Sequence, residues 1–199
     1  IPSTIVFLGF FAALYPSFRY FRDINWHIYK PSICGRALGS IIAGWITAYV
    51  VASGKIEITL GIVLLISIII SIFTIKKIKQ NATNHFIAGT ASGILGTVVG
   101  VGGTPIGIKY QNENPIMVRA NNNAFFVVGS LISFVILLLA GVMKIYHILF
   151  GFLLLPPLFL ASYVSRYLIK YSNNILKPYI LTICTISSIL LIARGFDII

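Results

Sequence analysis

Charged residues, and acidic ones above all, are scarce in this chain. Only four of its 199 residues are Asp or Glu, and charged residues make up 10% of the total against 58% hydrophobic residues. A soluble domain of this length needs far more polar surface, so the composition excludes an ordinary soluble protein. Together with a mean hydropathy of +0.97, it predicts an integral membrane protein.

The sequence also lacks the residue groups that most catalytic and metal sites need. Cys34 and Cys184 are far apart and form neither a CxxC motif nor a disulfide framework. His27, His85 and His147 lie near the ends of apolar segments, and the acidic residues are peripheral too. We therefore expect no enzyme, no metal and no cofactor. An intramembrane hydrolase is disfavoured because it would need a paired base at membrane depth.

Basic residues are common by comparison, with 15 Lys and Arg and a net charge of +11. They are concentrated between apolar runs, which is typical of contacts with lipid headgroups and of the positive-inside rule. We expect the lipid bilayer as a partner and no nucleic acid.

Seven apolar segments predict an α-helical bundle, since each is close to the ~20 residues that a helical span requires. Pro156 and Pro157 are expected to kink the sixth segment. The segments lie at about Ile1–Phe18, Pro31–Ala52, Ile56–Ile75, Phe86–Ile108, Ala120–Val142, Ile145–Leu168 and Tyr179–Ile192. Residues 1–199 are expected to form a single transmembrane domain.

An internal repeat emerges when the chain is shifted on itself by about 118–120 residues. The shift places Ala43–Tyr49 on Ala161–Tyr167, Trp26-His27 on Tyr146-His147, and Ser3-Thr4 on Asn122-Asn123. The first three segments then correspond to the last three, so residues 1–80 are the remainder of a first repeat and residues 81–199 a second one. The fourth segment has no counterpart within the chain, and we expect one upstream of Ile1.

The fourth segment is rich in glycine, with seven of the 17 glycines between Gly89 and Gly107. Gly89, Gly93, Gly96 and Gly100 fall near one helical face at a spacing typical of close helix packing.

The residues that follow, Gly102, Gly103 and Pro105, are expected to interrupt a straight helix. A broken helix at membrane depth is tolerated only where protein buries it or a cavity adjoins it. The break frees backbone amides around Gly102, Gly103 and Thr104, which favours an anion. Transporters use interrupted helices in this way.

The distribution of cations predicts that this segment enters the membrane and returns. If it spans, one side holds nine cations against six: Arg19, Arg22, Lys30, Arg36, Lys76, Lys77, Lys79, Lys144 and Arg194. If it re-enters, that side holds twelve against three, the three being Lys55, Lys144 and Arg194. The positive-inside rule favours the second arrangement. Each repeat then has three spans, an odd number, so the two repeats are inverted.

Polar residues at the start of the fifth segment complete the predicted anion site. Arg119 would supply charge, and Asn122 and Asn123 would donate hydrogen bonds. Ser3 and Thr4 would face them from the other repeat. An alternative is a hydrated helix start in which Asn side chains cap free amides. The predicted site residues are Gly100, Gly102, Gly103, Thr104, Pro105, Arg119, Asn122, Asn123, Ser3 and Thr4.

The second half of the chain contains a pattern of glycines at 89, 93, 96, 100, 102 and 103, followed by Thr104-Pro105, Pro115 and Arg119-Ala120-Asn121-Asn122. This pattern resembles the second-repeat signature of the TauE/SafE sulfite exporter family. The resemblance implies a multi-pass secondary transporter of the plasma membrane. Its substrate would be sulfite, a sulfonate or a related small organosulfur anion, and the implied direction of transport is export. The residues themselves leave open a structural or assembly protein without a substrate, a passive anion channel, and a homo-oligomer.

Overall fold

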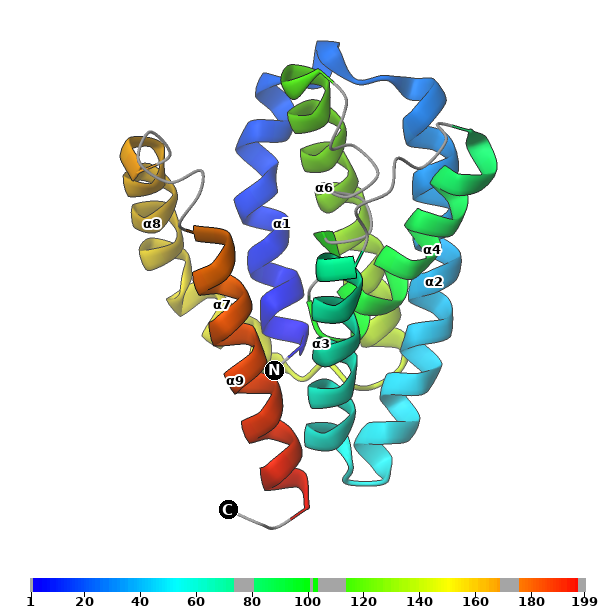
Figure 1. Cartoon of the computed structure of the whole chain (residues 1–199), viewed down its shortest axis with the longest axis vertical. Helices are drawn as coiled ribbons and strands as arrows, with labels where there is room; N and C mark the ends of the chain where they lie inside the picture. Colours follow the sequence, from blue (N-terminus) through cyan, green and yellow to red (C-terminus); the bar gives the residue numbers. More distant parts are fainter. Residues whose placement is uncertain (1, 74–80, 101, 104–113, 169–175, 197–199) are drawn as a thin grey trace.

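The computed structural model describes residues 2–73, 81–100, 102–103, 114–168 and 176–196. Over these residues the secondary structure is helical, without strands, which confirms the prediction of an all-helical protein (Figure 1). The elements are α1 (Pro2–Arg19), the short 3-10 helix η1 (Phe21–Asp23), α2 (Trp26–Ala52), α3 (Ile56–Phe73), α4 (Ala82–Val98), α6 (Pro115–Leu139), α7 (Ile145–Leu153), α8 (Leu155–Leu168) and α9 (Leu176–Gly195).

Three of the helices begin at an asparagine whose side chain accepts a backbone hydrogen bond. Asn25 caps α2, Asn81 caps α4 and Asn114 caps α6, because the first amides of a helix have no partner within it. The cap of α6 contradicts the alternative in which Asn121–Asn123 start that helix. These asparagines lie inside α6, which begins five residues before the predicted Ala120.

Helices α2, α4 and α6 run parallel to one another. Along α2, Gly35 adjoins Phe86 and Gly39 adjoins Thr90, so residue numbers rise together on α2 and α4. The same holds between α2 and α6, where the Tyr29 hydroxyl donates to the Ala124 carbonyl at 3.3 Å and Ser40 meets Ser133 further along. Because α4 and α6 are parallel, both start at the same end of the bundle, the upper end in Figure 1.

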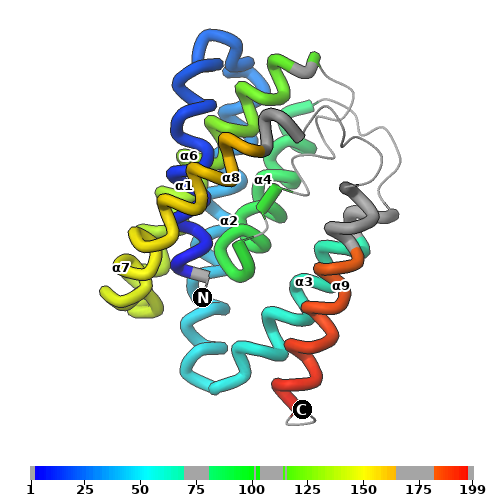
Figure 2. Tube along the Cα trace, turned by 90° about the vertical axis from the view of Figure 1, so that its left-hand side faces the viewer, coloured from blue at the N-terminus to red at the C-terminus, as the bar shows by residue number. Residues whose placement is uncertain are grey.

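Helix α1 packs antiparallel to α6, and α3 packs antiparallel to α9. The rings of Phe7 and Phe134 are 6.5 Å apart, while Gly9 adjoins Ser130. Gly61 adjoins Ser188, and Gly195 adjoins Ile58. Figure 2 shows α3 and α9 side by side at one edge of the bundle.

Glycines bring α2 and α4 into direct backbone contact. A Cβ added at Gly35, Gly39, Gly89 or Gly93 would lie within 3.0 Å of the facing backbone. Such small-residue crossings are the usual way for helices to associate in lipid. Gly89 and Gly93 therefore serve packing, as their spacing predicted.

Many polar side chains lie in the interior beside the apolar core, and many large apolar side chains lie on the exterior. Trp45 is 80% exposed, Leu139 82% and Leu153 70%. The residues with 0% exposure include Ser32, Ser40, Ser92, Thr97, Asn121 and Ser133. This arrangement suits a lipid solvent, in which interhelical hydrogen bonds and close packing hold a bundle together.

Two helices, Trp26–Ala52 and Ile116–Leu139, are long and apolar enough to cross a membrane, and the pair α7–α8 forms a third candidate span. Helices α7 and α8 meet at a bend of 41°, next to Pro156 and Pro157, which confirms the predicted kink. The apolar stretches Ser3–Arg19, Ile56–Ile69 and Thr182–Gly195 are shorter over their described residues.

Candidate functional site

Arg36 lies in the interior of the bundle, with only 3% of its surface exposed. It lies ten residues, or roughly 15 Å, along α2. Its Nη1 donates to the carbonyl of Ser92 and, at 3.1 Å, to the hydroxyl of the same residue on α4. Its Nη2 donates to the Ser133 hydroxyl on α6 at 3.3 Å. One arginine thus ties together the three parallel helices.

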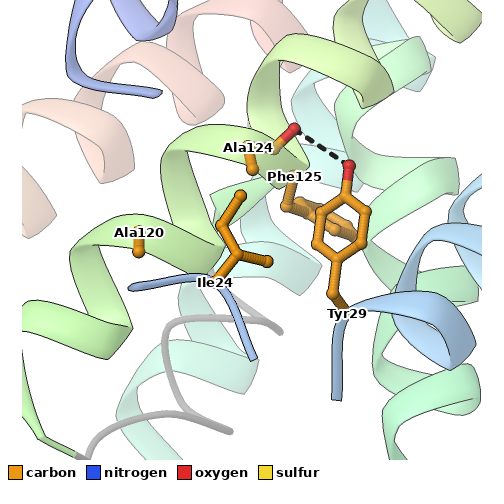
Figure 3. Packing of buried hydrophobic residues seen from close by; sticks show 5 residues of the cluster. All are labelled: Ile24, Tyr29, Ala120, Ala124 and Phe125. Atoms are coloured by element: carbon orange, nitrogen blue, oxygen red, sulfur yellow. Dashed lines mark hydrogen bonds between the residues drawn. The ribbon is translucent and has the colours of Figure 1, made fainter. Parts of the chain in front are cut away.

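An aromatic ring covers one face of the guanidinium. The Cζ atom of Arg36 lies 5.5 Å from the centre of the Phe125 ring, a cation–π distance. Phe125 is held by a small apolar cluster that joins the start of α2 to α6 and includes Ile24, Tyr29 and Ala124 (Figure 3).

No carboxylate balances the charge of Arg36 among the described residues. Of the acidic residues there, Asp23 is exposed in η1, and Glu57 pairs with Arg194 at 3.4 Å. The Nε atom of Arg36 is also buried without a hydrogen-bond partner in this part of the chain. A buried cation that meets only neutral groups is costly, and a bound anion would lower that cost.

Glycines on three elements leave room for the guanidinium. A Cβ at Gly96 or Gly102 would lie within 3.0 Å of Nη1, and a Cβ at Gly129 would lie 2.7 Å from Nε. Gly96 therefore differs from Gly89 and Gly93, although all three share one helical face. It makes space for a side chain, whereas they admit a neighbouring backbone.

A cavity of about 380 Å³ adjoins Arg36. It lies between α1 and the elements that hold the arginine. Its lining residues are Ile5, Val6, Leu8, Gly9, Ala12, Ala13, Arg36, Gly96, Gly100, Gly102, Asn123, Phe126, Ser130 and Leu158.

The helix break predicted in the fourth segment lies at this cavity. Helix α4 ends at Val98, and Gly100 has φ +81°, a left-handed conformation that favours glycine. The Ser92 hydroxyl donates to the Gly102 carbonyl, which fixes the chain just past the break. A Cβ at Gly103 would lie 2.9 Å from the Phe126 ring.

Three buried hydroxyl groups form a triangle next to Arg36. Thr97 on α4 contacts Ser40 on α2 at 3.0 Å and Ser133 on α6 at 2.8 Å, and Ser40 and Ser133 are 3.4 Å apart. Because Ser133 also accepts from Arg36, the triangle and the guanidinium form one polar network.

The structure brings some of the predicted site residues together. Gly100, Gly102 and Asn123 line the cavity, and Gly103 adjoins Phe126, which lines it too. Thr104 and Pro105 lie outside the described residues.

The other predicted residues are not among those that line the cavity. Ser3 is buried, and Thr4 donates to the His147 carbonyl at 3.4 Å. The Ser3 hydroxyl and the Asn122 Oδ1 have no hydrogen-bond partner among the described residues. Arg119 is exposed, and its carbonyl accepts from the Asn123 side chain at 2.7 Å.

Sequence reasoning missed Arg36 because it counted this residue among the cations outside the membrane. The structure corrects that assignment, and the charge asymmetry keeps its direction without Arg36. The signal was an arginine within an apolar segment, a position that marks a functional site by default. His85, near the start of α4, is likewise buried.

Comparison with known protein families identifies the chain's relatives. The family model described as sulfite exporter TauE/SafE matches residues 1–191. No curated protein and no solved structure matches the chain.

Proposed function

The chain belongs to the sulfite exporter TauE/SafE family, and from this premise we propose that it is a plasma-membrane secondary transporter that exports sulfite, a sulfonate or a related small organosulfur anion. Sulfite and simple sulfonates are the proposed substrates, and the cavity beside Arg36 is the proposed binding site. The family is one of transporters, and the apolar helices make the chain a membrane protein.

The observation that carries this proposal is the buried, uncompensated charge of Arg36. The guanidinium borders a cavity and meets hydroxyls and a ring, with no carboxylate among the described residues. An oxyanion matches such a donor, because guanidinium groups bind planar arrays of oxygen acceptors through several hydrogen bonds. In the proposed site the charge comes from Arg36 rather than from Arg119.

We further propose that the fourth apolar segment, which contains most of α4, re-enters the membrane and that residues 1–80 and 81–199 belong to inverted repeats. The parallel course of α4 and α6 supports re-entry, since the chain must return to the same end between them. The antiparallel pairs α1–α6 and α3–α9 support the inversion. In each pair, the two helices occupy equivalent positions in the two predicted repeats and run in opposite directions.

Counterflow in proteoliposomes tests the function. Radiolabelled sulfite should enter vesicles preloaded with unlabelled sulfite faster than empty ones, because a transporter exchanges substrate across the membrane. Arg36→Ala should lose at least about tenfold of this exchange, which corresponds to one charged hydrogen bond. Arg22→Ala, which removes an exposed arginine in η1, should exchange like the wild type.

Other results would contradict the proposal. Sulfite entry no faster than in protein-free vesicles would indicate a protein that does not transport it. Entry without stimulation by internal sulfite would indicate a passive channel.

A further inference from the structure

The cavity beside Arg36 has a polar end and an apolar wall. Arg36, Asn123 and Ser130 contribute its polar side chains. Facing them, α1 contributes six lining residues, none of which has a polar side chain. Phe126 and Leu158 extend this apolar wall.

The charge of the site suits an anion with a single negative charge. Arg36 is the only charged residue that lines the cavity within the described part of the chain. A second negative charge on the ligand would be buried without a partner, and an unpaired buried charge is strongly unfavourable.

The size of the cavity suits a ligand larger than an inorganic oxyanion. Its volume of about 380 Å³ falls within the range of ~300–1,000 Å³ that is typical of sites for organic molecules. A bare oxyanion at the guanidinium would leave the α1 wall without an apolar partner. A short hydrocarbon chain would cover that wall, and burial of each methylene favours binding.

On the basis of the proposed function, we infer that this cavity selects monoanionic organic sulfonates with a short aliphatic chain over inorganic sulfite and sulfate. The sulfonate group contacts Arg36, and the chain extends along α1 past Ala12. Each added methylene should tighten binding about fourfold until the cavity is full.

Ligand-dependent thermal stabilisation of the purified full chain tests this inference. The probes are methane-, ethane-, propane- and butanesulfonate, with sulfite and sulfate as the inorganic anions. We expect affinity to rise along the four sulfonates, and methanesulfonate to bind more tightly than sulfate. Methanesulfonate separates the effect of charge from that of the chain, because it carries one charge and a single carbon.

Ala12→Leu locates the aliphatic chain, because its larger side chain would occupy the apolar part of the cavity. This variant should lower the affinity for butanesulfonate at least about tenfold relative to the affinity for methanesulfonate. Ala161→Leu is the matched control, since the same change falls on an exposed residue of α8.

The possible outcomes separate this inference from the proposed function. Equal affinity along the sulfonates, or tighter binding of sulfite or sulfate, would overturn the preference while transport of sulfite still stands. A rise that Ala12→Leu leaves unchanged would overturn the assigned position of the chain. Failure of all six anions to bind the wild type would overturn the proposed function itself.

Discussion

The hydroxyl of Ser92 accepts a hydrogen bond from Arg36 at 3.1 Å and donates one to the carbonyl of Gly102. A single hydroxyl therefore connects the buried cation on α2 with the backbone just past the break after α4. If an anion draws the guanidinium toward the cavity, the Ser92 hydroxyl either loses this donor or moves with it, and a moving hydroxyl shifts its bond to Gly102. The cation and the broken segment form one unit.

Removal of this hydroxyl should weaken anion binding without unfolding the bundle. In Ser92→Ala, the hydroxyl's bonds to Arg36 and to Gly102 are both lost, but the Ser92 carbonyl still accepts from Arg36, so the net loss at the guanidinium is small. One neutral hydrogen bond is worth about 0.5–1.5 kcal/mol, so sulfite affinity should fall roughly 2- to 13-fold. Sulfite-dependent thermal stabilisation measures the change.

Ser32→Ala is the matched control for this prediction. Ser32 is as buried as Ser92, but its hydroxyl donates to the carbonyl of Ile28 in its own helix at 3.0 Å. Sulfite affinity should stay near that of the wild type. Equal losses in both variants would mean that the bridge to Gly102 does not matter for binding.

Two arginine variants should decide which cation binds the anion. Arg36→Lys keeps the charge but loses the planar fork that reaches Ser92 and Ser133, so sulfite should bind about 10- to 150-fold more weakly. Arg119→Ala should bind sulfite nearly as the wild type does, because Arg119 is exposed and is not among the cavity's lining residues. A larger loss of sulfite affinity in Arg119→Ala than in Arg36→Lys would indicate that Arg119, and not Arg36, binds the anion.

A methyl group at the crossing of α2 and α4 should destabilise the fold. In Gly39→Ala the new Cβ would lie within 3.0 Å of the Thr90 backbone, and overpacking typically costs about 1–3 kcal/mol. Thermal unfolding in detergent should show this loss. Gly9→Ala is the control, because its Cβ would lie 3.5 Å from the Ser130 hydroxyl, an ordinary contact. Equal stability of the two variants would mean that the helices separate easily.

Cysteine labelling should show that α4 and α6 start on the same side of the membrane. With Cys34 and Cys184 replaced by serine, Thr83→Cys and Ile116→Cys place thiols on exposed residues in the first turns of α4 and α6. An impermeant reagent should label both from one side and Ser53→Cys, at the far end of α2, from the other. Labelling of the two first-turn cysteines from opposite sides would contradict re-entry.

Much of the fold follows from the sequence because apolar length and glycine spacing act locally. The helical segments, the break near Gly100 and the bend next to Pro156 were all predicted. The start of α2 was placed at Pro31, five residues late, because the polar stretch after Asn25 looks like a loop until its capping hydrogen bond is known.

The site was predicted only in part because the direction of a side chain depends on the packing of distant helices. Arg36 points inward because Gly96, Gly102 and Gly129, which come from later parts of the chain, leave space for it. Arg119 was expected to supply the charge, since it follows the glycine motif closely in sequence. Proximity in sequence says little about which helix face meets the cavity.

The distance in sequence between Arg36 and its hydrogen-bond partners on α4 and α6 has a consequence for membrane insertion. Ser92 follows Arg36 by 56 positions and Ser133 follows it by 97, so α2 leaves the ribosome long before the partners of its arginine exist. An unpaired arginine at the centre of a helix opposes insertion by about 2.5–3.5 kcal/mol. The apolar residues of α2 must offset that penalty until α6 arrives, which makes burial of the arginine a late step in the biogenesis of this protein.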